Sequence, residues 1–176
     1  MFFEMKDYKL LHCFYILTNR VSVYNGVVLK TGGKMDRISV AECDKPLFQT
    51  ALTVQVGDVN YGGHLANDAV LRLCHEVRMR WLAALGWSEM DAGGTGLIMA
   101  DAAVQYLAQG HHGDELSVEM GAAGVAGVGF SLLYRIRRIS DGLVLAKVQT
   151  GMVCFDYGKQ RVCRLPSALK TALEAV

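Results

Sequence analysis

One short loop of this sequence gathers side chains that could carry out proton transfer. Asp58, Asn60 and His64 supply a carboxylate, an amide and an imidazole within seven residues. Imidazole is a general base near neutral pH and a carboxylate can also accept a proton, whereas an amide has no basic form. The adjacent glycines Gly62 and Gly63 let a ligand come close to the backbone. Spacing alone leaves a second interpretation open, a strand-to-helix turn in which Asp58 and Asn60 accept bonds from local N–H groups.

A long amphipathic helix is predicted directly after this loop, over residues 67–85. The residues that would form its apolar face are Val70, Leu73, Cys74, Val77, Trp81, Ala84 and Leu85. Asn67 is a suitable N-cap, and Gly86 follows the expected end of the helix. The first turn of a helix carries unpaired N–H groups and the positive end of the helix dipole. Such donors can stabilise an oxygen that becomes negative during acyl transfer.

The rest of the sequence predicts an antiparallel sheet around that helix. A strand over 48–56 precedes the loop, with Leu52, Val54 and Val56 on its buried side. Alternating apolar and polar residues then predict strands over 97–108, 115–122, 129–139, 143–157 (with a bulge at Gly151) and 161–165, and a last helix over 167–175. The turns at 112–114 and 140–142 are too short for parallel crossovers, so consecutive strands should pair antiparallel. The expected fold class is α+β.

The composition limits the possible partners. The 176 residues fit one domain of ordinary size, and 18 Lys plus Arg against 17 Asp plus Glu give a net charge of +1. This even balance disfavours a nucleic-acid partner. No apolar run reaches the roughly 18 residues of a membrane span, so we expect no membrane association. The five cysteines show no zinc-type spacing, which predicts reduced thiols, no metal site and a cytoplasmic location.

The first 34 residues differ from the rest of the chain. Residues 1–34 hold six of the fifteen aromatic residues and a net charge of +3, whereas residues 35–176 carry a net charge of −2. We therefore expect a dispensable N-terminal extension over 1–34 and a single domain over 35–176. An added strand or an oligomer contact is the alternative role for the extension.

Several motifs follow one another as they do in one enzyme family. The loop Asp58-Val59-Asn60-Tyr61-Gly62-Gly63-His64-Leu65-Ala66-Asn67, with Glu76-Val77-Arg78 and Trp81-Leu82, resembles the DxDxxGHxNN loop and ExR…WL helix of hotdog-fold acyl-CoA thioesterases of the 4-hydroxybenzoyl-CoA thioesterase type. Tyr106 with Gly113-Asp114-Glu115-Leu116, then residues 151–156 and Leu165-Pro166, are similar to later parts of that family's pattern. The resemblance covers about residues 47–170 and leaves out the first 34.

The resemblance implies a hotdog fold, in which a curved antiparallel sheet of five to six strands wraps a long central helix. It also implies homodimers or homotetramers with the active site at the subunit interface. In that family, backbone N–H groups at the helix start polarise the thioester carbonyl. The residue three before the motif glycine is usually an aspartate that acts as nucleophile or general base.

This sequence departs from the family pattern at that catalytic position. It has Asn60 there, and Ala66 replaces the first of the two usual asparagines. Asn60 cannot take a proton from water, but its side chain could orient the water through the amide oxygen or donate to the thioester carbonyl. A carboxylate restored at position 60 would then keep or raise activity.

The base must then come from another residue, and we consider three candidates. Asp58 matches the family's first aspartate, His64 is a natural base near pH 7, and Glu76 lies further along the helix. Each has a structural alternative: a loop cap, a hydrogen-bonding histidine, and a pair with Arg72 or Arg80. Asp58 is slightly favoured, because in an extended chain it would point to the same side as Asn60.

The remaining candidate residues would contact the substrate. Those expected near the acyl group or thioester are Tyr61, Gly62, Gly63, Asn67, Asp68 and Asp101. Asp101 could face the site from a partner subunit, or pair with an arginine. Arg135, Arg137 and Arg161 are available for the phosphates of coenzyme A, although charged residues on a strand are often only solvated. His111 and His112 are read as a solvated turn.

The function expected from these observations is hydrolysis of an acyl-CoA or acyl-carrier-protein thioester without metal or cofactor. A hotdog dehydratase acting on 3-hydroxyacyl thioesters is one alternative, since His64 and an acid could serve as its base and acid. A non-catalytic module that binds acyl thioesters is the other, because Asn60 replaces the usual catalytic aspartate.

Overall fold

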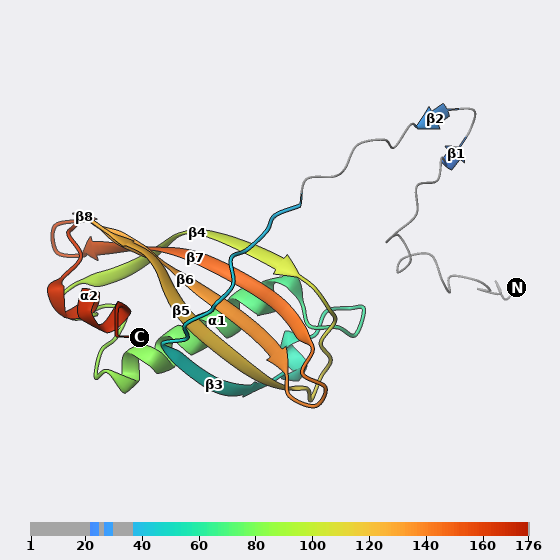
Figure 1. The fold of residues 1–176 in the computed structure, drawn as a ribbon, viewed down its shortest axis with the longest axis horizontal. Coiled ribbons are helices and arrows are strands. Elements are labelled where there is room, and N and C mark those ends of the chain that lie inside the picture. Colours follow the sequence, from blue (N-terminus) through green and yellow to red (C-terminus); the bar gives the residue numbers. More distant parts are fainter. Residues whose placement is uncertain (1–21, 25–26, 30–36, 176) are drawn as a thin grey trace, which may run out of the picture. The chain divides into compact units, whose positions relative to one another are not determined.

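The computed structural model describes residues 22–24, 27–29 and 37–175, and the chain divides into two compact units, Met1–Arg37 and Ile38–Val176. In the first unit, β1 (Ser22–Tyr24) and β2 (Val27–Leu29) form an antiparallel hairpin. The rest of the extension predicted over 1–34 lies outside the described residues. The other elements belong to the second unit, which carries the motifs of interest (Figure 1).

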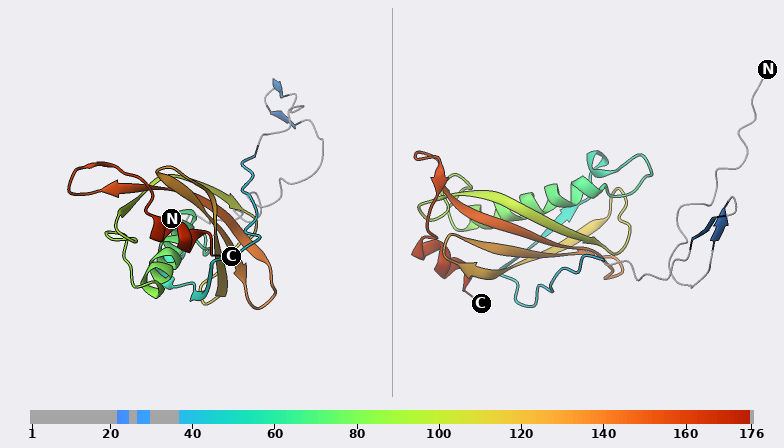
Figure 2. Two further views of the ribbon diagram at one scale, coloured as in Figure 1. Left: turned by 60° about the vertical axis from the view of Figure 1, so that its left-hand side comes forward. Right: turned by 90° about the horizontal axis from the view of Figure 1, so that it is seen from above.

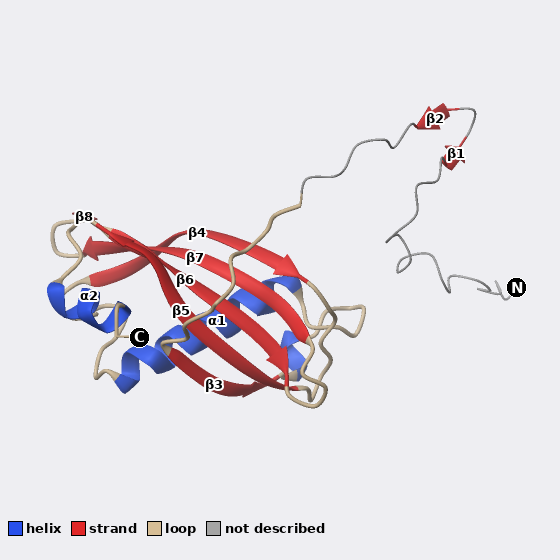
Figure 3. Cartoon of the chain, in the orientation of Figure 1, coloured by secondary structure: helices blue, strands red, loops and turns tan. Residues whose placement is uncertain are grey.

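The second unit contains one antiparallel sheet that curves around a long helix, which confirms the predicted α+β fold (Figure 3). Its strands are β3 (Phe48–Thr53), β4 (Gly96–Tyr106), β5 (Glu115–Ala126), β6 (Gly129–Arg138), β7 (Val144–Asp156) and β8 (Arg161–Val162). The strand order is β3-β5-β6-β7-β4, and β8 pairs with the end of β7. The long helix is α1 (Asn67–Ala84), and a short helix, α2 (Ser167–Leu173), follows β8.

The pairing expected across the 112–114 turn is wrong. β4 pairs with β7 and β5 pairs with β3, so the two strands that this turn joins lie on different sides of the sheet. After β4 the chain still follows β7, because the N–H groups of Leu107 and Ala108 both donate to the carbonyl oxygen of Leu145. The chain then passes the residues that precede α1, where the N–H of Leu65 donates to the carbonyl oxygen of Gly110. The turn at 140–142, in contrast, joins the paired strands β6 and β7 as predicted.

The bulge expected at Gly151 lies in the neighbouring strand. The register between β4 and β7 shifts between Met99 and Asp101, opposite Gly151 and Met152. A Cβ atom at position 151 would lie 2.5 Å from Oδ2 of Asp101, which covers the glycine on the sheet face away from α1. The glycine therefore marks the irregularity correctly, but it accommodates the bulge of β4 rather than forming one itself.

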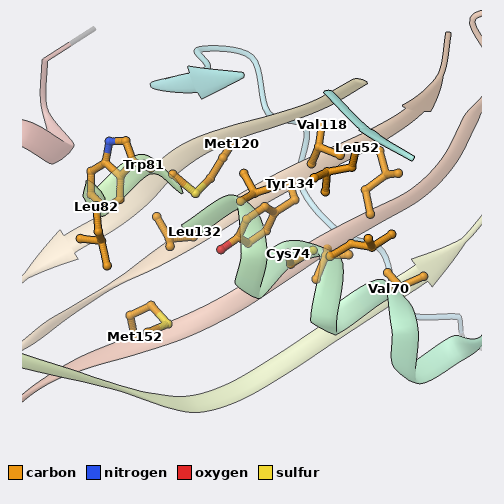
Figure 4. Packing of buried hydrophobic residues seen from close by; sticks show 14 of the residues in the cluster. Leu52, Val70, Cys74, Trp81, Leu82, Val118, Met120, Leu132, Tyr134 and Met152 are labelled. Atoms are coloured by element: carbon orange, nitrogen blue, oxygen red, sulfur yellow. The ribbon is translucent and has the colours of Figure 1, made fainter. Parts of the chain in front are cut away.

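The main core lies between α1 and the sheet (Figure 4). Its largest fully buried side chains include Tyr134, Leu82, Leu116, Met120, Leu132, Ile136, Leu145 and Met152.

Three expectations at element ends are wrong. Val56 lies in a 3-10 turn, η1 (Val56–Asp58), and is 78% exposed, because β3 has already ended. Ala84 and Leu85 are exposed where α1 ends, and the N-cap of α1 is Ala66 rather than Asn67.

The opposite face of the sheet is crossed by residues 38–46, seen below the sheet in the right view of Figure 2. Val40 and Cys43 are buried there, and a Cβ atom at Gly121 would lie 2.7 Å from the carbonyl oxygen of Lys45. Glu42 forms ion pairs with Lys147 and, at 3.8 Å, with Arg135. Residues 38–46 therefore form a second, smaller packing layer on the face of the sheet that points away from α1.

Candidate active site

The predicted polar loop is a closed turn in front of α1. Val59 and Leu65 form an antiparallel bridge, and the N–H of Asn60 donates to the carbonyl oxygen of His64 at 2.8 Å. The N–H of Gly63 donates in turn to the carbonyl oxygen of Asn60 at 2.9 Å. Gly63 has a φ of 80°, in the left-handed region that glycine adopts without strain. The loop therefore has a defined backbone conformation that can hold side chains in place.

Asn60 is anchored by its amide oxygen. Oδ1 accepts hydrogen bonds from the N–H of Gly62 at 2.9 Å and from the N–H of His64 at 3.3 Å. Because the oxygen faces these two donors, the amide nitrogen points away from the loop backbone. That nitrogen can only donate a hydrogen bond. Asn60 is thus suited to contact a carbonyl oxygen, and less suited to accept a proton from a water molecule.

The imidazole of His64 lies beside Asn60, with Gly62 between them. A Cβ atom at position 62 would lie 3.2 Å from Oδ1 of Asn60 and 3.4 Å from Nδ1 of His64. Because position 62 has no side chain, the space between the amide oxygen of Asn60 and the imidazole of His64 stays open. His64 is half-buried, and its ring meets the ring of His111 at a centroid distance of 5.3 Å. Tyr61, at the tip of the same loop, is fully exposed.

The first turn of α1 adds backbone donors to this group. Ala66, the N-cap, has no side chain that could accept a bond from the helix N–H groups. Asp68 is exposed and pairs with Arg72, which lowers the pKa of its carboxyl group through a hydrogen bond from Arg72. Tyr106, at the end of β4, donates from its hydroxyl to the carbonyl oxygen of Asn67 at 3.0 Å. Burial raises the pKa of Tyr106, so this hydroxyl stays protonated.

Asp58 faces a different side of the loop from Asn60 and His64. Its Oδ2 accepts a hydrogen bond from the N–H of Gln55 at 3.0 Å, and its Oδ1 lies 3.5 Å from Nη2 of Arg72. The carboxylate thus closes the η1 turn and contacts α1. The expectation that an extended chain turns Asp58 toward Asn60 does not hold here, because η1 replaces the extended strand.

Asp58 lines a cleft of about 370 Å³ between β3 and α1 together with Glu76. The other lining residues are Ala51, Leu52, Thr53, Gln55, Leu73, Arg80 and Glu115. Glu76 accepts a hydrogen bond from Nε of Arg80 at 2.7 Å, and Arg80 also donates to the carbonyl oxygen of Ala51. The structure therefore brings Asp58 and Glu76 together, but apart from Asn60 and His64.

The other predicted contact residues are spread over the sheet. Asp101 is exposed on the face away from α1. On that face Arg135 pairs with Glu119 at 2.5 Å, and this hydrogen bond raises the pKa of Arg135. Arg137 donates to the carbonyl oxygen of Gly142, at the end of the sheet near the loop, whereas Arg161 lies on β8 at the other end.

Sequence reasoning missed the residues of the chain segment that follows β4. His111 lies in an exposed turn, as the sequence predicts, and its ring also meets the ring of His64, 47 positions earlier in the sequence. Asp114 accepts hydrogen bonds from the N–H of His111 at 2.9 Å and from Nη1 of Arg138 at 3.1 Å. Burial favours a higher pKa for Asp114, but these two bonds lower it below its ordinary value. No local sequence signal predicts the contact between His64 and His111, because it depends on the path of the chain between β4 and β5.

The described residues show no cluster of metal ligands and no membrane-spanning helix. Within residues 22–24, 27–29 and 37–175, no three His, Cys, Asp or Glu side chains group as metal ligands would. In the same ranges the helices lack the length and apolar character needed to span a bilayer.

Comparison with known proteins places the fold among thioesterases. A model of the thioesterase-like superfamily matches residues 54–173. A 1,4-dihydroxy-2-naphthoyl-CoA hydrolase from Synechocystis is 26% identical over 123 residues, covering 68% of this chain and 89% of that protein. The crystal structure of a 1,4-dihydroxy-2-naphthoyl-CoA thioesterase from Synechocystis superposes with a TM-score of 0.65, over 72% of this chain and 94% of the other. A gentisyl-coenzyme A thioesterase, 20% identical, shares the fold with a TM-score of 0.62, over 70% of this chain and 99% of the other.

Proposed function

Since the chain belongs to the thioesterase-like superfamily and is a thioester hydrolase, we propose that it cleaves an acyl-CoA to the free acid and coenzyme A at the loop of Asn60 and His64. Two relatives are named for aromatic acyl-CoA substrates. Aromatic acyl groups are therefore the first substrates that we propose for this enzyme. The observation that carries the placement is the open space over Gly62, which the Asn60 side chain and the His64 imidazole flank.

The amide of Asn60 and the first turn of α1 would stabilise the reacting carbonyl oxygen. The amide oxygen is held by two backbone N–H groups, so the amide nitrogen is directed outward as a donor. The N–H groups at the start of α1 add the positive end of the helix dipole. Donors fixed before the reaction stabilise the negative charge that develops on a thioester oxygen without reorganising.

His64 would act as the general base. A water molecule attacks the thioester carbon, and the imidazole of His64 takes the proton that this water loses. The tetrahedral intermediate then collapses, its C–S bond breaks, and the imidazolium returns the proton to the leaving thiolate. Asp58 is less suited to this role, because its carboxylate already accepts the N–H of Gln55 and lies near Arg72. The proposal needs neither a metal nor a cofactor.

We also propose that the enzyme works as a homodimer or homotetramer in a reducing, cytoplasmic compartment. Among the described strands, none pairs with the outer edge of β4, and an open edge of 11 residues favours association with another strand. Met99 on this strand is 48% exposed. Four cysteines are free thiols in the described part of the chain, which supports the reducing compartment.

The test is turnover of a panel of aromatic and aliphatic acyl-CoA thioesters by the full chain, with free thiol and new double bonds measured separately. Thiol release that falls at least about 100-fold in His64→Gln, and stays near wild type in Asp58→Asn, supports the assignment. His112→Gln, an exposed neighbour of the site, is the matched control. Double-bond formation without thiol would indicate a dehydratase, and tight binding without turnover a binding module. Full activity in both His64→Gln and Asp58→Asn would move the base outside this loop.

A further inference from the structure

The ring contact between His64 and His111 joins two segments that are also bonded through their backbones. The N–H of Leu65, next to His64, donates to the carbonyl oxygen of Gly110, next to His111, at 2.8 Å. The two imidazole planes meet at 67°, an edge-to-face arrangement with centroids 5.3 Å apart. Aromatic rings favour this geometry. The contact therefore rests on a fixed backbone link and is not a chance meeting of two exposed side chains.

His111 is itself held in place from the far side. Its backbone N–H donates to Oδ2 of Asp114 at 2.9 Å, and its Nδ1 lies 4.0 Å from the same oxygen. Asp114 is bound by Nη1 of Arg138 at 3.1 Å, and Arg138 also donates to the carbonyl oxygen of Gln109 at 3.2 Å. Arg138 is the last residue of β6, the central strand in the order β3-β5-β6-β7-β4. A chain of contacts thus runs from the sheet through Asp114 and His111 to the ring of His64.

We propose that His111 is a positioning residue, whose ring fixes the orientation of the His64 imidazole for proton transfer. The proposal rests on the function proposed above for His64. His64 is half-buried after Gly62 and Gly63, and its ring meets the ring of His111 edge to face, so His111 restricts the rotation of the His64 ring. A general base must lie within about 3 Å of the atom that carries the proton it takes, and a displacement of about 1 Å can cost up to about 100-fold in rate.

This role predicts a specific pattern of kinetic constants. Loss of the ring in His111→Ala should lower kcat about 10-fold while KM stays within about twofold, because the substrate contacts remain. His111→Phe keeps an aromatic ring without the ring nitrogens, and should retain kcat within about threefold. His112→Ala, the exposed neighbour, should behave like wild type.

A double-mutant cycle separates positioning from a general structural effect. Because His111 acts through His64, His111→Ala should cause no further loss in a His64→Gln background. An additional loss of about 10-fold in that background, or equal kcat values in His111→Ala and wild type, would overturn the proposal. If His64→Gln alone keeps the wild-type rate, the function proposed for His64 has failed instead. The two failures are therefore distinguishable in one set of four proteins.

Discussion

The guanidinium of Arg78 binds a single carboxylate oxygen of Glu89 with two nitrogens, Nε at 2.7 Å and Nη2 at 2.5 Å. Arg78 is 5% exposed on the face of α1 that packs on the sheet, and Glu89 lies in the chain segment after that helix. Glu89 also lies 3.0 Å from Nε2 of His75. The pair ties the segment that leads into β4 to the middle of α1.

Removing one partner of this pair should be costly. Arg78→Ala leaves Glu89 without its main partner and opens space in the core, and a broken buried pair costs about 3–5 kcal/mol. Urea unfolding of the variant should show that decrease in the free energy of unfolding. Lys170→Ala removes an exposed partner that lies 3.8 Å from Glu174, and should change stability by less than about 1 kcal/mol. Equal losses in the two variants would contradict the role assigned to Arg78.

The same pair gives stability a defined dependence on pH. Burial favours a higher pKa for Glu89, but the hydrogen bonds from Arg78 and His75 lower it below the ordinary value of 4.5. A carboxyl group with a lowered pKa in the folded state stabilises the protein above its unfolded pKa, and loses this effect as the pH falls through the folded pKa. The stability difference between wild type and Glu89→Gln should therefore be constant near pH 7 and shrink below about pH 4.5. A constant difference down to pH 3 would contradict it.

Asn60 should be required as a hydrogen-bond donor. Asn60→Ala removes the amide nitrogen and should lower kcat about 100- to 1,000-fold, the usual cost of losing one donor to a developing oxyanion. Asn60→Asp should lose at least as much, since its carboxylate would accept the same two N–H groups and place a negative charge beside the reacting oxygen. This reverses the expectation drawn from the family pattern. A fully active Asn60→Asp enzyme would show that a carboxylate can act at this position after all.

Gly121 should be required for the layer formed by residues 38–46. A Cβ atom there would lie 2.7 Å from the carbonyl oxygen of Lys45 and 2.9 Å from Sγ of Cys43. Gly121→Ala should therefore cost about 1–3 kcal/mol, the usual range for overpacking, and raise amide hydrogen exchange in residues 38–46. Gly57→Ala, where a Cβ atom meets nothing within 4 Å, is the control. Unchanged exchange in Gly121→Ala would show that the segment adjusts without loss.

Two truncations should have opposite outcomes. A chain that begins at Met35 keeps every residue of the main core and the segment that covers the sheet, so it should retain its fold and activity. A chain that begins at residue 47 loses the buried side chains of Val40 and Cys43, and it also loses Glu42, the ion-pair partner of Lys147. Its midpoint of thermal unfolding should fall clearly below that of the first. Loss of folded protein on the shorter truncation would show that residues 1–34 are structural.

The elements of this fold follow from local patterns, but their arrangement does not. Apolar spacing predicted α1 to within one residue at its end, since that spacing records which face is buried. The neighbours of β4 could not be read from its sequence, because pairing with β7 joins positions about 50 residues apart. Arg78 lies among the apolar positions of α1, and its ion pair with Glu89, beyond the helix end, compensates the burial of its charge.

The candidate site could be predicted only in part, because local patterns identify the loop but not its contacts with distant segments. The glycines, Asn60 and His64 are adjacent in the sequence, so composition and spacing were enough to single out the loop. The direction of the Asp58 side chain depends on the short turn η1, which ends the strand earlier than its alternation indicates. His111 lies beside His64 because the chain between β4 and β5 runs past the loop in front of α1, and this path depends on the strand order of the whole sheet.

The strip of backbone at residues 38–46 also constrains how copies of this chain could assemble. It lies across the middle of the sheet surface that faces away from α1, with the carbonyl oxygen of Lys45 directly over Gly121. Two copies cannot pack these sheet surfaces against each other through their centres unless residues 38–46 are first displaced in both. Higher-order assembly that leaves the fold intact must therefore use a strand edge, the helix side, or the end of the sheet that the strip leaves bare.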